Sequence, residues 1–209
     1  RNTLIEKVNA CSANLDFEKV YNSKQRTFYG IEFVWNNVNS EAIGENILSG
    51  SSFSISNRYP DGDWSSYAAF LNHQYDISDK ITAQAGLRYN LYELKADFSE
   101  NEEFFPLPEL NSSINNGSLT GSLGLTYRPN KKTKISLLGS TGFRAPNVDD
   151  IGKVFDSEPG SVVVPNPNLE AEYAYNAEVG FSRFIGNALH FDVNVFYTIL
   201  ENAMVRRNA

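Results

Sequence analysis

Cysteine, histidine and long apolar runs are scarce in this sequence. Because Cys11 is the only cysteine, an internal disulfide framework and a cysteine metal cluster are excluded. No run of 18 apolar residues occurs and the mean hydropathy is -0.37, so we expect no transmembrane helix. The only histidines, His73 and His190, are far apart in the sequence. An enzyme needs a nucleophile or activated water beside such groups, so the catalytic signal is weak.

Basic residues and a secretion signal are also lacking. The 18 Lys and Arg are outnumbered by 25 Asp and Glu, which gives a net charge of -7 and a pI near 4.9. This acidity argues against nucleic acid as a partner. Arg1 begins in ordinary sequence, without a signal peptide. We therefore expect the sequence to be a piece of a longer chain.

The sequence is rich in segments where apolar and polar residues alternate. In 171–183 the odd positions include Tyr173 and Val179, whereas the even positions include Glu172 and Glu178. A period of two predicts a β-strand with one apolar and one polar face. Eight segments of this kind occur, at 5–17, 26–36, 65–76, 81–94, 118–128, 132–143, 171–183 and 189–199.

The connections between these segments alternate between short and long. The long ones are 37–64, 95–117 and 144–170. Short turns at one end and long loops at the other are typical of an outer-membrane barrel, whose strands need about 9–11 residues to cross the bilayer. The sequence thus predicts an all-β fold, a transmembrane antiparallel up-and-down β-barrel with about eight sequential strands. A soluble all-β fold is the alternative.

Aromatic residues on the odd face support the barrel. In this topology they gather near the two membrane boundaries, as lipid-facing girdles do. The outer group is Trp35, Tyr89, Phe143, Tyr173 and Tyr197, and the periplasmic group is Phe17, Tyr75, Tyr127 and Phe181. We expect Leu87, Leu123, Val179 and Val193 to face lipid, and Arg88, Gly124, Glu178 and Asn194 to face the lumen.

Three motifs carry a resemblance to a known family. They read GFRAPN at 142–147, PNPNLEAE at 165–172 and EVG at 178–180. In this order, on the expected strand ends, they resemble the barrels of the TonB-dependent outer-membrane receptors. Residues 65–90 are also similar to a hairpin of those barrels. One departure is Ala171, which stands where the family usually has proline.

The resemblance implies a larger molecule. Barrels of this transporter type have about 22 strands, so residues 1–209 would be part of one barrel. The plug domain, the N-terminal barrel strands and the C-terminal strands would be absent. We expect both outer strands of the segment to remain unpaired with each other. The alternative is a complete eight-stranded barrel with a structural or adhesive role.

The function implied by the resemblance is energy-coupled uptake of a scarce nutrient across the cell outer membrane of a Gram-negative bacterium. The substrate would be a siderophore-iron complex, haem, cobalamin or a carbohydrate. The implied partners are outer-membrane lipid, the small-molecule substrate and the TonB energy-transducing complex, reached through the plug. We expect a monomeric barrel that is not an enzyme and has no cofactor or metal site. An outer-membrane hydrolase is a weaker alternative, because His73 would face lipid and His190 the lumen, both near the short turns.

Charged residues at even positions are the candidate site residues. A charge in the lipid face costs about 2–4 kcal/mol for Arg or Lys, so these side chains are expected in the lumen. They would pair with one another, contact the plug or line the substrate path. They are Glu32, Arg88, Arg144, Glu172 and Glu178. We expect a charge-assisted contact between Arg144 and Glu172, which would lie at the same height.

A second candidate is an acidic run in the third long loop. Its members are Asp149, Asp150, Asp156 and Glu158. Carboxylates can bind a cation, but their spacing matches no 12-residue calcium loop. These residues are therefore candidates for an extracellular loop site, with a solvated loop as the alternative.

Overall fold

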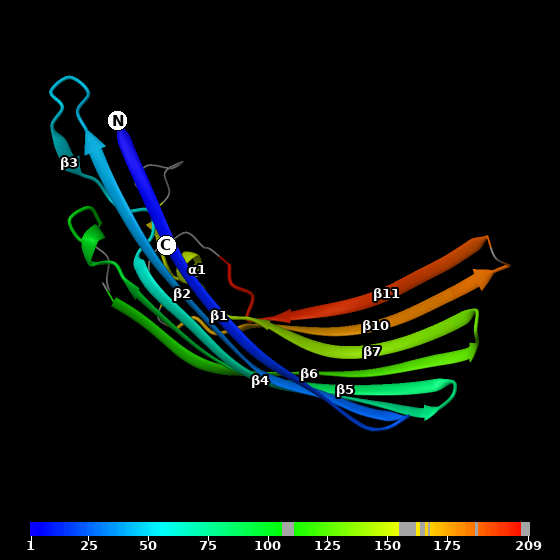
Figure 1. Cartoon of the computed structure of the whole chain (residues 1–209). Helices are drawn as coiled ribbons and strands as arrows, with labels where there is room; N and C mark the ends of the chain where they lie inside the picture. The colour runs from blue at the N-terminus through cyan, green and yellow to red at the C-terminus, as the bar shows by residue number, and fades with distance from the viewer. Residues whose placement is uncertain (106–110, 155–161, 164–165, 167, 187, 206–209) are drawn as a thin grey trace.

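A single curved antiparallel sheet makes up most of the chain (Figure 1). The computed structural model describes residues 1–105, 111–154, 162–163, 166, 168–186 and 188–205. The sheet consists of β1 (Asn2–Asn22), β2 (Gln25–Glu45), β3 (Ser52–Ser54), β4 (Asp61–Ser78), β5 (Ile81–Asp97), β6 (Asn111–Asn130), β7 (Thr133–Arg144), β10 (Glu172–Ile185) and β11 (Leu189–Glu201). The smaller elements are η1 (Ser99–Asn101), α1 (Val148–Ile151), β8 (Lys153–Val154) and β9 (Val162–Val163).

The strands pair in the order in which they occur along the chain. The path runs β1-β2-β4-β5-β6-β7-β10-β11, and β3 pairs back onto β2. This confirms the predicted up-and-down arrangement of eight principal strands. Within the described residues no ladder joins β1 to β11, so the sheet is not closed. The predicted open edges are therefore observed, and a closed eight-stranded barrel is not.

Strand register separates the residues into two faces. In the ladders between the eight principal strands odd-numbered residues pair with odd ones, apart from shifts at the β1–β2, β4–β5 and β6–β7 turns. In the short β2–β3 ladder odd residues pair with even ones, so the numbering parity is reversed on β3. We call the two sides the odd face and the even face. Leu87 is 60% exposed and Leu123 68% exposed on the odd face, and Val179 and Val193 share that face. Arg88, as the neighbour of Leu87 in β5, lies on the even face, so the predicted separation is confirmed.

The strands are longer than the sequence predicted. β2 continues to Glu45 and β4 begins at Asp61, so much of the expected loop 37–64 is strand. Likewise β5 extends to Asp97 and β6 begins at Asn111, which shortens the expected loop 95–117. The prediction of loops was wrong in these parts because the odd residues there are polar. Backbone pairing nevertheless continues without a register shift.

The chemistry of the two faces reverses along the strands while their pairing stays the same. On β5 the odd face is apolar through Leu91 and polar at Glu93 and Lys95. The even face changes in the opposite sense, from Arg88 to the buried Leu94. We call the part beyond this reversal the strand extension. It has a polar odd face and an apolar even face, which is the inverse of the rest of the sheet.

A hydrophobic core covers the even face of the strand extension. It contains Tyr92, Leu94, Ala96, Phe98, Ile114, Val148, Ile151 and Ala171. Val148 and Ile151 come from α1, so the connection between β7 and β10 folds back over the sheet. Phe143 and Tyr173 also pack against this core. Their assignment to a lipid-facing outer girdle was therefore wrong, because the ring of Phe143 contacts those of Tyr92 and Tyr173 at this core.

Candidate functional site

Arg88 is the centre of a polar cluster on the even face. Its Nη2 donates to Glu32 Oε2 at 2.5 Å, and its Nε donates to Asn90 Oδ1 at 2.8 Å. Asn90 Nδ2 in turn donates to Ser66 Oγ at 2.5 Å. Because β2, β4 and β5 lie side by side, three strands each contribute a member. The ion pair is about one-third exposed, with 34% of Arg88 and 35% of Glu32 accessible.

A shallow hollow of about 320 Å³ adjoins this cluster. The even-face side chains that line it are Glu32, Phe70, Asn72, Arg88, Thr120 and Ser122. Gly86 forms part of its floor, since an added Cβ there would approach Ser122 Oγ to 2.9 Å and Asn72 Nδ2 to 3.0 Å. The hollow therefore combines one neutralised ion pair with neutral hydrogen-bonding groups.

Glu178 lies apart from the Arg88 cluster. On the even face of β10 it is level with Leu138 of β7 and Phe196 of β11. None of the ion pairs found among the described residues includes Glu178. The five predicted site residues thus share one face but form separate groups.

Arg144 joins the two ends of the connection between β7 and β10. Its Nε donates to Glu172 Oε2 at 2.8 Å, which confirms the predicted contact. Its Nη1 also donates to Asp150 Oδ2 at 2.8 Å, a partner that the sequence did not predict. The hydrogen bond to Glu172, together with the charge of Asp150, raises the pKa of Arg144. Through its bond to Asp150 the guanidinium, which is always charged in proteins, holds α1 beside the sheet.

Only two of the four members of the predicted acidic run, Asp149 and Asp150, lie in the described residues, and both belong to α1. Asp150 completes a capping box, because its N–H donates to Asn147 Oδ1 at 3.0 Å and its carboxylate accepts from Asn147 N–H at 3.1 Å. Asp149 lies in the same first turn of α1. Asp156 and Glu158 lie outside the described residues. In the described part of the chain, no three His, Cys, Asp or Glu side chains are grouped so that they could hold a metal ion.

Tyr92 is a buried residue beneath α1 that sequence reasoning did not single out. It is 1% exposed, and its hydroxyl has no hydrogen-bond partner among the described residues. Burial raises the pKa of this hydroxyl, and the neighbouring Tyr173 and Glu170 raise it further. The burial of Tyr92 could not be predicted from the sequence, because its neighbours along the chain resemble those of the exposed Tyr89. It becomes apparent only from the apolar residues that surround Tyr92 in the fold.

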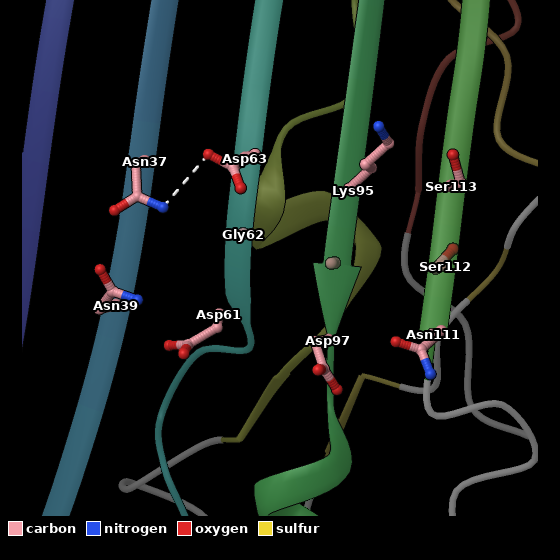
Figure 2. A pocket seen from close by; sticks show the side chains of 11 residues that line it. Asn37, Asn39, Asp61, Gly62, Asp63, Lys95, Asp97, Asn111, Ser112 and Ser113 are labelled. Carbon is pink, nitrogen blue, oxygen red and sulfur yellow. Dashed lines mark hydrogen bonds between the residues drawn. The ribbon is translucent and has the colours of Figure 1, made fainter.

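A polar trough of about 480 Å³ lies on the opposite, odd face of the strand extension (Figure 2). Asn37 Nδ2 donates to Asp63 Oδ1 at 3.2 Å across β2 and β4. Lys95 and Asp97 of β5 line the next part of the trough (Figure 2). Because these residues fall in segments that were expected to be loops, the sequence did not predict them as a group.

The histidines lie near the short turns, as predicted. Thr27 Oγ1 and His73 Nδ1 are 2.8 Å apart on the odd face. His190 Nε2 is 2.9 Å from Ser182 Oγ and 3.8 Å from Asp192 Oδ2 on the even face. A Ser-His-Asp relay needs the carboxylate and the hydroxyl on different ring nitrogens. Here both lie at the same nitrogen, so the geometry does not match that relay.

Comparison with known proteins identifies the family. The family model for the β-barrel of TonB-dependent receptor-like proteins matches residues 4–209. A hemoglobin-haptoglobin utilization protein B of Neisseria meningitidis is 28% identical over 137 residues, which are 62% of this chain and 16% of that protein. A probable hemoglobin and hemoglobin-haptoglobin-binding protein 4 of Haemophilus influenzae is 35% identical over 77 residues, 37% of this chain and 8% of that protein.

Solved structures show the same fold. The copper transporter OprC superposes with a TM-score of 0.74 at 13% identity, over 94% of this chain and 30% of that one. The hemophore receptor HasR of Serratia marcescens, in complex with its hemophore HasA and heme, gives 0.71 at 19% identity, over 97% and 34%. The chain thus spans about a third of each of these two structures, and a smaller share of the curated relatives.

No helix in the described ranges has the length and hydropathy to span a bilayer. The sequential antiparallel strands superpose on the two solved structures over 94% and 97% of this chain. Since the family model covers nearly the whole chain, this chain belongs to the TonB-dependent receptor family, as a segment of its β-barrel.

Proposed function

We propose that this chain is part of an outer-membrane receptor that takes up haem by TonB-coupled transport. The observation that carries the proposal is the family match over residues 4–209 together with the relatives named for haemoglobin utilization and binding. These relatives favour haem over the siderophore, cobalamin and carbohydrate alternatives. Coupling to the TonB complex would require a plug domain within the barrel, and the barrel would act as a monomer.

The two faces of the sheet support this role. The odd face, with Leu87 and Leu123, would contact outer-membrane lipid up to the reversal, since exposed apolar side chains suit hydrocarbon. The even face would line the lumen, where the Arg88–Glu32 pair and the adjacent hollow lie along the ligand's path. β1 and β11 would pair with further strands of the same barrel, because unpaired backbone groups cost several kcal/mol each in hydrocarbon.

Uptake by cells that express the full-length protein tests the proposal. Such cells should grow with haemoglobin as the sole iron source and should accumulate labelled haem. Deletion of the gene, or of TonB, should abolish both, while growth on a ferric salt at high concentration stays unchanged. Haem uptake that persists without TonB would contradict the proposal.

A further inference from the structure

Positively charged residues are concentrated at one end of the sheet, where the short turns lie together (Figure 1). Lys131 and Lys132 form the turn between β6 and β7, and Arg183 lies opposite Thr133 near the end of β10. This turn contacts the one between β10 and β11, since Lys132 Nζ donates to Gly186 O at 3.5 Å. We call Lys131, Lys132 and Arg183 the basic patch. It presents three cations from two neighbouring hairpins.

The basic patch is not neutralised by ion pairs within the described part of the chain. None of the ion pairs found there includes Lys131, Lys132 or Arg183. Asp192, on the strand beside Arg183, is level with Ser182 and therefore lies on the even face, whereas Arg183 lies on the odd face. The patch thus carries a positive charge that favours an anionic partner.

Arg183 lies among apolar side chains on the odd face. Along β10 its neighbours on this face are Phe181 and Ile185, and across the ladder it is level with Phe191. Ile185 is 56% exposed and Phe191 is 50% exposed, and the ring centroids of Phe181 and Phe191 lie 6.4 Å apart. A long cationic side chain in such a place keeps its stem against apolar groups and extends its charged head into the polar layer. The guanidinium therefore marks the boundary between hydrocarbon and lipid head groups.

The groups around the guanidinium suit a phosphate. Thr133 is directly opposite Arg183 in the ladder, so their Cβ atoms lie about 5 Å apart on the same face. A guanidinium donates two parallel hydrogen bonds to a phosphate, and a threonine hydroxyl can donate a third. The two lysines of the patch add positive charge beside this pair. The patch thus combines directional donors with charge.

The opposite end of the odd face carries negative charge (Figure 2). Asp61, Asp63 and Asp97 line the polar trough there. The charge of Lys95 in the same trough is balanced by Glu93, whose Oε1 lies 2.8 Å from Lys95 Nζ. It therefore does not offset the three aspartates. Anionic head groups are repelled at that end of the face and attracted at the basic patch.

We propose that the basic patch binds the phosphate of an anionic phospholipid in the membrane leaflet beside the short turns. The inference rests on the proposed function only in that it takes the odd face as the lipid-facing surface of an outer-membrane barrel. The guanidinium and the Thr133 hydroxyl would hydrogen-bond the phosphate, and Phe181 and Phe191 would contact the acyl chains. Each Lys or Arg near an anionic surface strengthens binding about fivefold, so the patch should prefer an anionic to a zwitterionic head group.

The test measures lipid binding by the full-length protein in a neutral detergent, with native mass spectrometry as the readout. The probes are phosphatidylglycerol and phosphatidylcholine with the same acyl chains, and neither haem nor TonB is present. The wild type should bind its first phosphatidylglycerol at least about tenfold more tightly than phosphatidylcholine. Arg183→Gln with Lys132→Gln should weaken phosphatidylglycerol binding at least about tenfold, because two charges are removed. Phosphatidylcholine binding should change much less.

The matched control is Lys19→Gln with Lys24→Gln, which removes the same charge at the β1–β2 hairpin. It should leave phosphatidylglycerol binding within about twofold of the wild type, because exposed charges more than about 10 Å apart are screened by salt. Arg183→Gln alone should weaken binding about fivefold, and it replaces the double variant where the latter does not fold. Arg183→Lys should lose less, since an ammonium keeps the charge but not the two parallel bonds.

Three results would overturn the proposal. They are equal binding of the two lipids by the wild type, unchanged phosphatidylglycerol binding by the Arg183 variants, and an equal loss in the Lys19→Gln, Lys24→Gln control. Displacement of phosphatidylglycerol by inorganic phosphate would also overturn it, because the site would then take the free anion rather than a lipid. If the lipid preference is absent while haem uptake persists, this inference fails and the proposed function stands. Loss of TonB-coupled uptake with the preference intact would have the opposite meaning.

Discussion

Arg144 shows how one side chain can fasten a long connection at both ends. Replacing it with alanine removes its bonds to Glu172 and Asp150 at once. Because the guanidinium is 46% exposed, each ion pair is worth only about 0.5–1 kcal/mol. A double-mutant cycle with Arg144→Ala and Glu172→Gln should therefore give a coupling energy of that size in urea unfolding of the full-length protein. A coupling near zero would contradict a bond that holds the connection.

Tyr92 carries a hydroxyl that the fold leaves without a partner. Leaving such a group buried costs about 1–3 kcal/mol, so Tyr92→Phe should leave the unfolding free energy unchanged or raise it by up to that amount. Tyr89→Phe is the matched control, because Tyr89 is 48% exposed on the odd face. A loss of stability in Tyr92→Phe would reveal a hydrogen bond to this hydroxyl.

Because the pKa of Tyr92 is raised in the folded protein, the free energy of unfolding should depend on pH. The hydroxyl keeps its proton above the pH of about 10 at which an unfolded tyrosine ionises. The stability contributed by this residue is thus complete below about pH 10 and falls as the pH rises beyond it. Tyr92→Phe should flatten that part of the decline, measured as unfolding free energy from pH 9 to 11.

At the scale of elements, the position of α1 is stabilised more by its packing against the core than by hydrogen bonds within the helix. Ile151 is 0% exposed and Val148 is 9% exposed, and both contact the core of the strand extension. Ile151→Ala should cost about 2–5 kcal/mol and should speed hydrogen exchange at residues 148–152. Leu119→Ala, at a 61% exposed odd-face position of β6, should leave that exchange unchanged. Equal exchange in both variants would mean that α1 is not held by this core.

Alternation within each strand was sufficient to predict the order and facing of the eight principal strands, but not their outer ends. In 81–91 the odd residues are apolar, and the pattern can be interpreted without knowledge of the rest of the fold. From Tyr92 onward the apolar residues are on the other face, because Val148 and Ile151 cover that face from more than 50 positions away in the sequence. Such long-range packing leaves no local signal.

The candidate site was predictable to a similar extent. The partnership of Arg144 and Glu172 follows from strand ends at equal height, and that prediction was correct. Asp150 joins them only because Asn147 begins a helix there. The trough beside Asp63 was missed for the same reason as the strand extension, since its residues alternate in the opposite phase.

At the scale of the whole molecule, the position of the reversal determines what a charge costs. Leu87→Arg places a cation on the odd face within the apolar band and should destabilise the full-length barrel by about 2–4 kcal/mol. Asn37→Arg places the same charge on the same face beyond the reversal and should cost no more than about 1 kcal/mol. Unfolding in lipid vesicles measures both. Equal costs would contradict a membrane boundary at the reversal.

Spin labels along β5 test the central claim most directly, namely that one strand passes from lipid into water where its polarity reverses. Single labels in the full-length, Cys11→Ser protein would replace odd residues on each side of the reversal, with accessibility to oxygen and to a polar nickel complex as the readout. We predict lipid contact at Leu87, Tyr89 and Leu91, and water contact at Glu93 and Asp97. Lipid contact that continues through Asp97, or water contact at Leu87, would contradict the account.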